Sequence, residues 1–187
     1  ATLTNVISGQ ILGTPTLPEA YSLIKGYVVG PGVVLTGADL TDSGEPDTGL
    51  PETGLAGFDL SNANLSASVL TDAILTGADL TSANLTGATL TNVVSGQIIG
   101  APTLPAAYTM VDGYIVGPTV DLTDAIFTAA DLASSDLTDA NLTSATLNNA
   151  VLTDAVLTGV DLTEADLTGA TLTNVISGQI LGTPTLP

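Results

Sequence analysis

The feature that most constrains this chain is a repeat of five residues. Residues 73–77, 78–82 and 83–87 read AILTG, ADLTS and ANLTG. In each unit a small residue is followed by a variable residue, Leu, Thr and a turn-forming residue. This period matches neither the 3.6 residues of an α-helix nor the two residues of a β-strand. A helix would spread these leucines around its surface, and a flat strand would send alternate ones to opposite faces. A constant inward Leu therefore requires a chain that turns a corner every five residues.

The repeat runs through most of the chain. In steps of five, its central positions run from Leu3 to Gly13, from Leu35 to Gly100 and from Leu122 to Gly182. Twenty-two of these 30 central residues are Leu, and the residue two before the centre is Ala in 15 units. One large and one small inward residue per unit suit a narrow, closely packed interior.

The position two after each centre favours a corner. A type II turn needs a positive φ at its third residue, which Gly, Asn and Asp tolerate best. The sequence therefore predicts left-handed backbone at Gly37, Asp42, Gly57, Asn62, Asp72, Gly77, Gly87, Asn92, Asp139, Asn149, Asp154, Gly159, Gly169 and Asn174.

These units resemble the pentapeptide-repeat family, whose motif is A(D/N)LXX. The motif stands here as ADL at residues 38–40, 130–132 and 165–167, and as ANL at 63–65 and 140–142. The resemblance implies an all-β fold, a right-handed quadrilateral β-helix (β-solenoid) of stacked pentapeptide coils with twenty residues per coil. We expect one such solenoid over residues 1–187, with its coils about 4.8 Å apart.

Stacked coils place residues twenty apart above one another. Asp39, Asp59 and Asp79 then form a column of carboxylates, which repel unless water, salt or a cation intervenes. These three residues are the candidate metal site, with Ca²⁺ as the expected ion, and no other cofactor is expected. Two further columns are expected, one of Asp121, Asn141 and Asp161 and one of Asn64 and Asn84.

Two matching inserts, 14–32 and 101–119, break the five-residue phase. They begin TPTLPEAY and APTLPAAY and continue to a Gly-Tyr pair. Asp112-Gly113 between apolar residues is a strong hairpin signal, and Lys25-Gly26 lies at the same place in the other insert. We therefore expect β-hairpin-like inserts, with strands near 21–24, 27–30, 108–111 and 114–117.

The inserts hold all four tyrosines of the chain, its single Met and its single Lys. Tyr offers an apolar body with a polar tip and is favoured at interfaces. Two interpretations remain open: the hairpins cover one face of the solenoid, or they bind a partner. The candidate partner-binding residues are Tyr21, Lys25, Tyr27, Tyr108, Met110 and Tyr114.

Residues 43–57 form an irregular segment. They keep the five-residue phase but place Glu45 where an inward Leu belongs, and burial of an unpaired carboxylate is costly. We expect a local bulge or loop, with packing beside it adjusted by Phe58. A cation site of Glu45, Asp47 and Glu52 is an alternative, although the spacing differs from that of a calcium loop.

Composition excludes many functions. The chain has 187 residues, one Lys or Arg, 19 Asp and Glu, a net charge of −18, and no His, Cys or Trp. Zinc fingers and Ser-His-Asp triads are excluded, as are direct nucleic-acid binding by phosphate neutralisation and a polybasic membrane patch. No apolar run is long enough for membrane insertion and no signal peptide is visible. We expect no enzyme and no small-molecule substrate.

The two ends repeat each other. Residues 1–18 and 170–187 are identical, and residues 88–105 are a near copy. The chain is then either a segment of a longer array or a unit that self-associates by end-to-end stacking, because unprotected strand edges invite pairing. These features favour a non-catalytic structural or interaction protein, a rigid rod in a fibre or surface structure. An acidic, Thr-rich chain also suits an extracellular or cell-surface location, with the periplasm as an alternative.

The family resemblance implies a second function. Some pentapeptide-repeat proteins mimic the width and charge of a DNA duplex and bind bacterial gyrase. The net charge of −18 suits such an acidic DNA-mimic binding module. Those relatives carry a dimerising C-terminal helix, for which this sequence has no counterpart.

Overall fold

The computed structural model describes residues 3–40 and 54–187. Within them all regular structure is β: six strands of three residues each and no helix. The chain divides into two compact units, unit 1 (1–93 and 97–106) and unit 2 (94–96 and 107–187). A single solenoid over the whole chain stays a prediction. No helix long and apolar enough to cross a membrane occurs in this described part.

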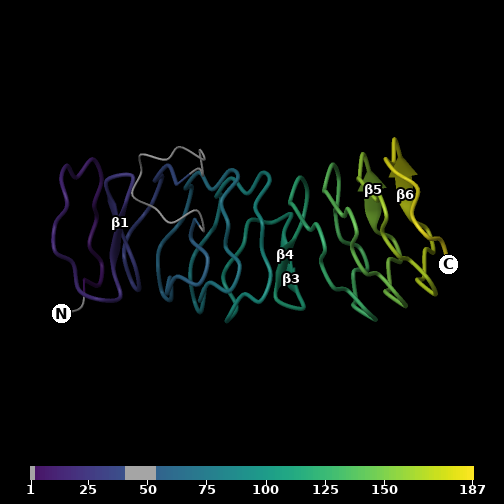
Figure 1. The fold of residues 1–187 in the computed structure, drawn as a ribbon, viewed down its shortest axis with the longest axis horizontal. Helices are drawn as coiled ribbons and strands as arrows, with labels where there is room; N and C mark the ends of the chain where they lie inside the picture. The colour runs from purple at the N-terminus through teal and green to yellow at the C-terminus, as the bar shows by residue number, and fades with distance from the viewer. Residues whose placement is uncertain (1–2, 41–53) are drawn as a thin grey trace. The chain divides into compact units, whose positions relative to one another are not determined.

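A ladder of parallel pairs between residues twenty apart organises unit 2. Asp121 bridges Asn141, which bridges Asp161, so the expected column is confirmed. The same spacing recurs five, ten and fifteen residues further along the chain, where β5 (Val156–Thr158) also pairs in parallel with β6 (Ile176–Gly178). Four pairing positions thus recur in every twenty residues, and Figure 1 shows β5 and β6 side by side near the C-terminus.

Unit 1 contains the same ladder, but its spacing changes at several places. Asp59 bridges Asp79, and Asn64 bridges Asn84, as expected for residues twenty apart. Asp39, however, bridges Val69, thirty residues away. The expected column of three carboxylates is therefore wrong at Asp39, because the pairing across residues 41–53 is ten residues longer than the twenty-residue spacing of the repeat. The irregular segment 43–57, with Glu45, Asp47 and Glu52, lies largely outside the described residues.

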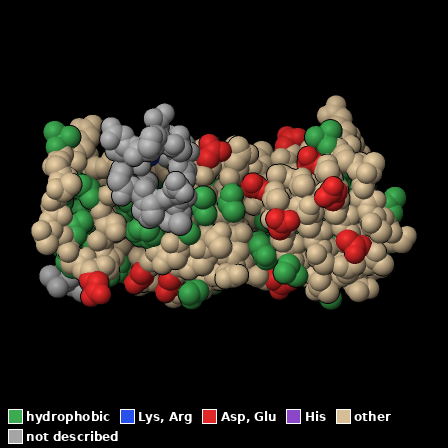
Figure 2. Space-filling view, in the orientation of Figure 1, with side chains coloured by type: hydrophobic (Ala, Val, Ile, Leu, Met, Phe, Trp, Pro, Cys, Tyr) green, Lys and Arg blue, Asp and Glu red, His purple; other side chains and the backbone are tan. Residues whose placement is uncertain are grey.

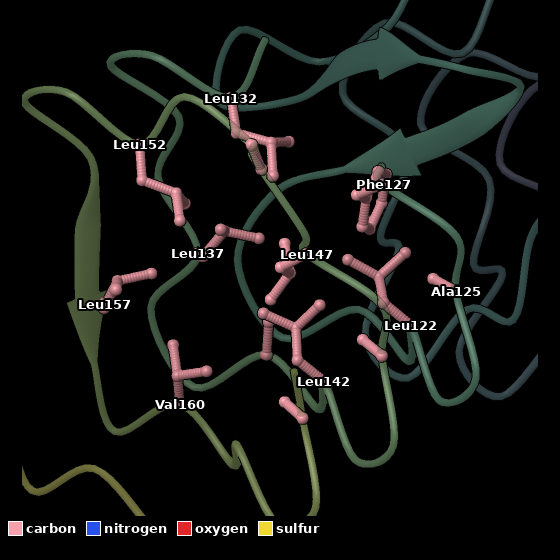
Figure 3. Packing of buried hydrophobic residues seen from close by; sticks show 14 of the residues in the cluster. Leu122, Ala125, Phe127, Leu132, Leu137, Leu142, Leu147, Leu152, Leu157 and Val160 are labelled. Carbon is pink, nitrogen blue, oxygen red and sulfur yellow. The ribbon is translucent and has the colours of Figure 1, made fainter. Parts of the chain in front are cut away.

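The interior is built from the two inward positions of each unit. In unit 2 the central residues Leu122 to Leu167 are at most 3 % exposed, and so are most of the small residues two before them. Figure 3 shows Phe127 with leucines of neighbouring repeats, their side chains pointing into a shared core. Burial of a Leu side chain contributes about 1.5 to 3 kcal/mol, so this regular packing is the main source of stability.

The corners are confirmed at every described position for which the sequence predicts them. Asn62 has φ 58°, and Ala63 N–H donates to Leu60 O across it at 3.0 Å, as in a type II turn. The same conformation occurs at Ala67 (φ 54°) and Ala129 (φ 59°), residues that disfavour it. Position in the repeat therefore dictates the corner even where the residue does not favour it.

Replacing a core leucine should test this account of stability. Leu147 is 1 % exposed, and Leu147→Ala leaves a cavity in a narrow interior, so we expect a loss of about 2 to 5 kcal/mol in unfolding free energy. Leu186→Ala is the control, because Leu186 is 64 % exposed and should change little. Equilibrium urea unfolding measures both; equal losses would contradict the inward assignment.

Candidate functional site

The two inserts form the hairpins that the sequence predicts. In unit 1, β1 (Ser22–Ile24) pairs antiparallel with β2 (Tyr27–Val29), and in unit 2, β3 (Thr109–Val111) pairs with β4 (Tyr114–Val116). Both turn residues have a positive φ in each hairpin: 46° and 78° at Lys25-Gly26, and 49° and 82° at Asp112-Gly113. This pattern is that of a type I′ turn, whose twist matches the flanking strands.

The first tyrosine of each insert joins the two ends of that insert, and Tyr21 also binds Leu3 of the preceding coil. Tyr21 Oη accepts a hydrogen bond from Leu3 N–H at 2.8 Å and donates to Pro31 O at 3.2 Å. Tyr108 Oη donates to Pro118 O at the same distance. Burial raises the pKa of the Tyr108 hydroxyl, so this group stays protonated and continues to donate over the neutral range.

The second tyrosine of each insert lies against the coil that precedes the insert. A Cβ on Gly9 would be 3.1 Å from the Tyr27 ring, and one on Gly96 would be 3.0 Å from the Tyr114 ring. Only a glycine admits the ring so close. Tyr114 also lies 5.0 Å from Phe127 between ring centroids, in a tilted arrangement that stabilises aromatic pairs.

A serine beside each of these glycines completes the docking. Val28 N–H donates to Ser8 Oγ at 2.7 Å, and Ile115 N–H donates to Ser95 Oγ at 3.0 Å. We use the term receptor module for the 18-residue sequence that carries this Ser-Gly pair: residues 1–18, 88–105 and 170–187. The threefold repeat of this module is visible in the sequence, but the role of its Ser-Gly pair is not.

These contacts decide between the two interpretations of the inserts only in part. Tyr21 is 7 % exposed and faces the fold, while Tyr27, Tyr108 and Tyr114 are half-buried. Tyr27 and Tyr114 therefore cover the preceding coil. Lys25 and Met110 are half-buried at the two hairpins, one in each unit. Partner binding by the six residues stays a prediction.

The outward Asp and Asn of the motif have a structural role that the sequence alone did not indicate. Asp161 Oδ1 accepts from the N–H of Thr163 at 2.9 Å and from its Oγ1 at 2.6 Å. The same side chain-to-backbone bond is made by Asp59, Asp79, Asp121, Asp131, Asp136 and Asp166 and by Asn64, Asn84 and Asn141. Each one closes an Asx turn at the start of a corner, which explains the choice of Asp or Asn at this outward position.

Hydrogen bonds also stabilise the carboxylate charge. Thr81, Thr163 and Thr168 lower the pKa of Asp79, Asp161 and Asp166 through their hydroxyl and N–H groups, and Asn148 adds to the effect at Asp166. In the Asn column, Asn84 Nδ2 donates to Asn64 Oδ1 at 3.4 Å. Figure 2 shows the acidic side chains scattered over the visible face of the described residues without a common patch.

The described residues contain no group of three or more acidic side chains placed to hold a metal ion. Asp59 and Asp79 are brought together as bridge partners, and Asp39 is paired with Val69. Binding of Ca²⁺ stays a prediction for the Asp59 and Asp79 pair, without a third carboxylate from Asp39.

The repeat identifies the family. The family model for pentapeptide repeats matches eight copies, at residues 59–94, 120–143 and 135–174. The chain belongs to the pentapeptide-repeat family. Proteins of this family are generally non-catalytic interaction proteins. No curated protein gave a significant match to the sequence.

Solved pentapeptide-repeat proteins resemble the chain. A protein of the Arabidopsis thaliana thylakoid lumen is 22% identical, with 72% of this chain and 68% of that chain covered and a TM-score of 0.28. HetL of Nostoc sp. strain PCC 7120, involved in heterocyst differentiation regulation, is 27% identical, with 80% and 70% covered and a TM-score of 0.29. A trypsin-treated form of QnrB1, a plasmid-mediated fluoroquinolone resistance protein, is 14% identical, with 79% and 83% covered and a TM-score of 0.28.

The three receptor modules allow a matched test of insert docking. Ser95 is 7 % exposed, so Ser95→Ala leaves the buried Ile115 N–H without its acceptor, and we expect a loss of about 1 to 3 kcal/mol in unfolding free energy. Ser177 occupies the same place in residues 170–187 but is exposed, and Ser177→Ala should change little in the monomer. Urea unfolding at low protein concentration compares the two; equal effects would contradict the docking role of Ser95.

The Asx turn can be tested through protonation. Thr163→Val removes the hydroxyl donor and keeps the backbone donor, so the pKa of Asp161 should rise toward its ordinary value. The lowered pKa stabilises the fold at pH values above the ordinary pKa of 3.8, and this contribution is lost as pH falls through the folded-state pKa. A carboxyl NMR titration measures the shift, with Asp166 as the internal control. An unchanged Asp161 titration would refute the hydroxyl's role.

Proposed function

We propose that this chain is a non-catalytic structural protein whose pentapeptide coils form a right-handed quadrilateral β-solenoid and stack on other copies in a fibre or surface structure. The observation that carries this proposal is the ladder of parallel pairs between residues twenty apart. Four pairing positions in every twenty residues correspond to four sides of a coil. A fold of this kind grows by adding coils, since each coil contacts only its neighbours.

The inward position of residues 170–187 is open to a further coil, of this chain or of another copy. Ile180 is 37 % exposed there, whereas Ile98 and Val160, at the same inward position of other coils, are 8 % and 0 % exposed. Strand β6 pairs with β5 on one side and is an edge of its sheet in the described structure. An edge with apolar neighbours is a template for another strand.

The acidic DNA-mimic alternative depends on net charge alone. The likeness to QnrB1 is too low, at 14% identity and a TM-score of 0.28, to carry a shared partner. Seven outward aspartates of this chain have a local explanation in the Asx turns that they close within their own repeats. We therefore propose the structural role, and expect no effect of the protein on supercoiling by gyrase.

Sedimentation velocity and electron microscopy test self-association. We expect species that grow with protein concentration, and Ile180→Asp should prevent growth because it places a charge on the uncovered layer. Ile126→Asp is the matched control, because Ile126 is 62 % exposed on an outward position and should leave growth intact. Monomers at every concentration, for the unmodified chain, would refute the proposal.

A further inference from the structure

Phe58 departs from the packing of its repeat. It occupies the small inward position, where Ala63, Ala73 and Ala78 are at most 2 % exposed. Phe58 is only half-buried, whereas Phe127 takes a central position of its repeat and is buried. A narrow interior that holds one large and one small side chain per repeat has no room for a second large one. Part of the Phe58 side chain therefore stays outside the core.

A cavity of about 360 Å³ lies beside Phe58. It is lined by residues 56–59 of the repeat and by Glu19, Ala20 and Ser22 of the first insert. All of these residues belong to the described part of unit 1. The volume is near the lower end of the range of small-molecule sites, and two segments far apart in the sequence contribute to it. The cavity is therefore large enough for a small organic ligand.

Two carboxylates give this cavity a negative charge. Asp59 Oδ1 accepts from Ser61 N–H at 3.0 Å, so its carboxylate is held at the corner beside the cavity. Asp79, the bridge partner of Asp59, adds a negative charge from the neighbouring coil. Glu19 is exposed and lies outside the five-residue phase, so the Asx turns do not account for its charge. The second insert has Ala106 at the equivalent position. The carboxylate of Glu19 is thus particular to this cavity.

We propose that this cavity binds a small organic ammonium ion, whose charged nitrogen lies near Glu19 and Asp59 and whose carbon substituents contact the Phe58 ring. The ligand is bound and is not transformed. This inference goes beyond the proposed structural function and applies to a single copy of the chain, so it does not depend on self-association.

The combination of an aromatic ring with carboxylates favours this class of ligand. The face of an aromatic ring attracts a cation, and quaternary ammonium ions are recognised in this way. The carboxylates attract the same charge, and this attraction is stronger beside the protein than in bulk water. Methyl or methylene groups on the nitrogen also gain from contact with the ring, because apolar surface leaves water. A neutral ligand of the same shape would gain only this last contribution.

A metal ion fits this cavity less well than an organic cation. Ca²⁺ takes about six to eight oxygen ligands. The part of the chain that the structure describes has no group of three or more acidic side chains placed to hold a metal ion. Phe58 supplies no oxygen, and its ring occupies part of the lining. The cavity therefore matches a cation that carries its own apolar groups.

A titration of the full chain with choline chloride tests the proposal. Saturation-transfer NMR observes the ligand and therefore works for monomers and for assembled chains. We expect binding with a dissociation constant on the order of millimolar. Neohexanol, in which a carbon atom replaces the nitrogen of choline, should bind about tenfold more weakly or not at all. Equal binding of the two compounds, or no binding of choline, would overturn the proposal.

Three variants locate the binding site. Phe58→Leu keeps an apolar side chain and removes the ring. Asp59→Asn removes the charge and keeps the Oδ1 acceptor of the Asx turn, and Glu19→Gln removes the charge at an exposed position. Each variant should raise the dissociation constant for choline about threefold or more. Glu19→Gln keeps the test valid if a change at Phe58 disturbs the fold, because an exposed side chain of the same length contributes little to stability.

Asp161→Asn is the matched control for Asp59→Asn. Asp161 closes the same kind of Asx turn in unit 2, and its replacement removes the same charge from the chain, but it does not line the cavity. Choline should bind this variant with an unchanged dissociation constant. If Asp161→Asn weakened binding as much as Asp59→Asn, the net charge of the chain would account for the attraction and the proposal would fail. Unchanged binding by Phe58→Leu would also contradict it, because the ring would then have no role.

Discussion

The left-handed corner is the constraint on which the rest of this structure depends. Each corner changes the direction of the chain through a residue of positive φ and an i to i+3 hydrogen bond, such as Ala63 N–H to Leu60 O at Asn62. Only with a corner every five residues do all the central leucines face inward. The conformation costs an L-residue such as Ala129 about 1 to 2 kcal/mol relative to a right-handed one. Buried Leu and the ladder of backbone bonds offset that cost.

The acidity of the chain follows from the same corners. An aspartate before the corner accepts the N–H and the hydroxyl of a threonine two residues later, as Asp161 does from Thr163. The carboxylate is fixed by local donors, which lower its pKa without a basic partner. Part of the net charge of −18 can therefore accumulate without basic partners, because seven aspartates stabilise their own turns in this way. The charge alone is thus poor evidence for an acidic partner surface.

Local and periodic features could be predicted from the sequence, because they depend on residues close together or at a fixed separation. The corner at Asn62, the hairpin turn at Asp112-Gly113 and the pair Asn64 with Asn84 are confirmed. The register of Asp39 could not be predicted, because the pairing across residues 41–53 is ten residues longer than the repeat. The Ser-Gly docking pair was also missed, because its meaning depends on a tyrosine about twenty residues away along the chain.

The receptor modules have nearly the same sequence, but their serines differ in burial. Ser95 is buried and bonded in one module, while Ser177, in the same local sequence, is exposed in another. Ser95 is covered by residues 108–116, which supply the Tyr114 ring and the Ile115 N–H. Residues 170–187 keep the same backbone pairing as the rest of the repeat, since β6 pairs with β5 and Leu181 N–H donates to Val160 O. The five-residue repeat thus determines the backbone pairing, whereas the burial of the serine depends on an insert packed against it.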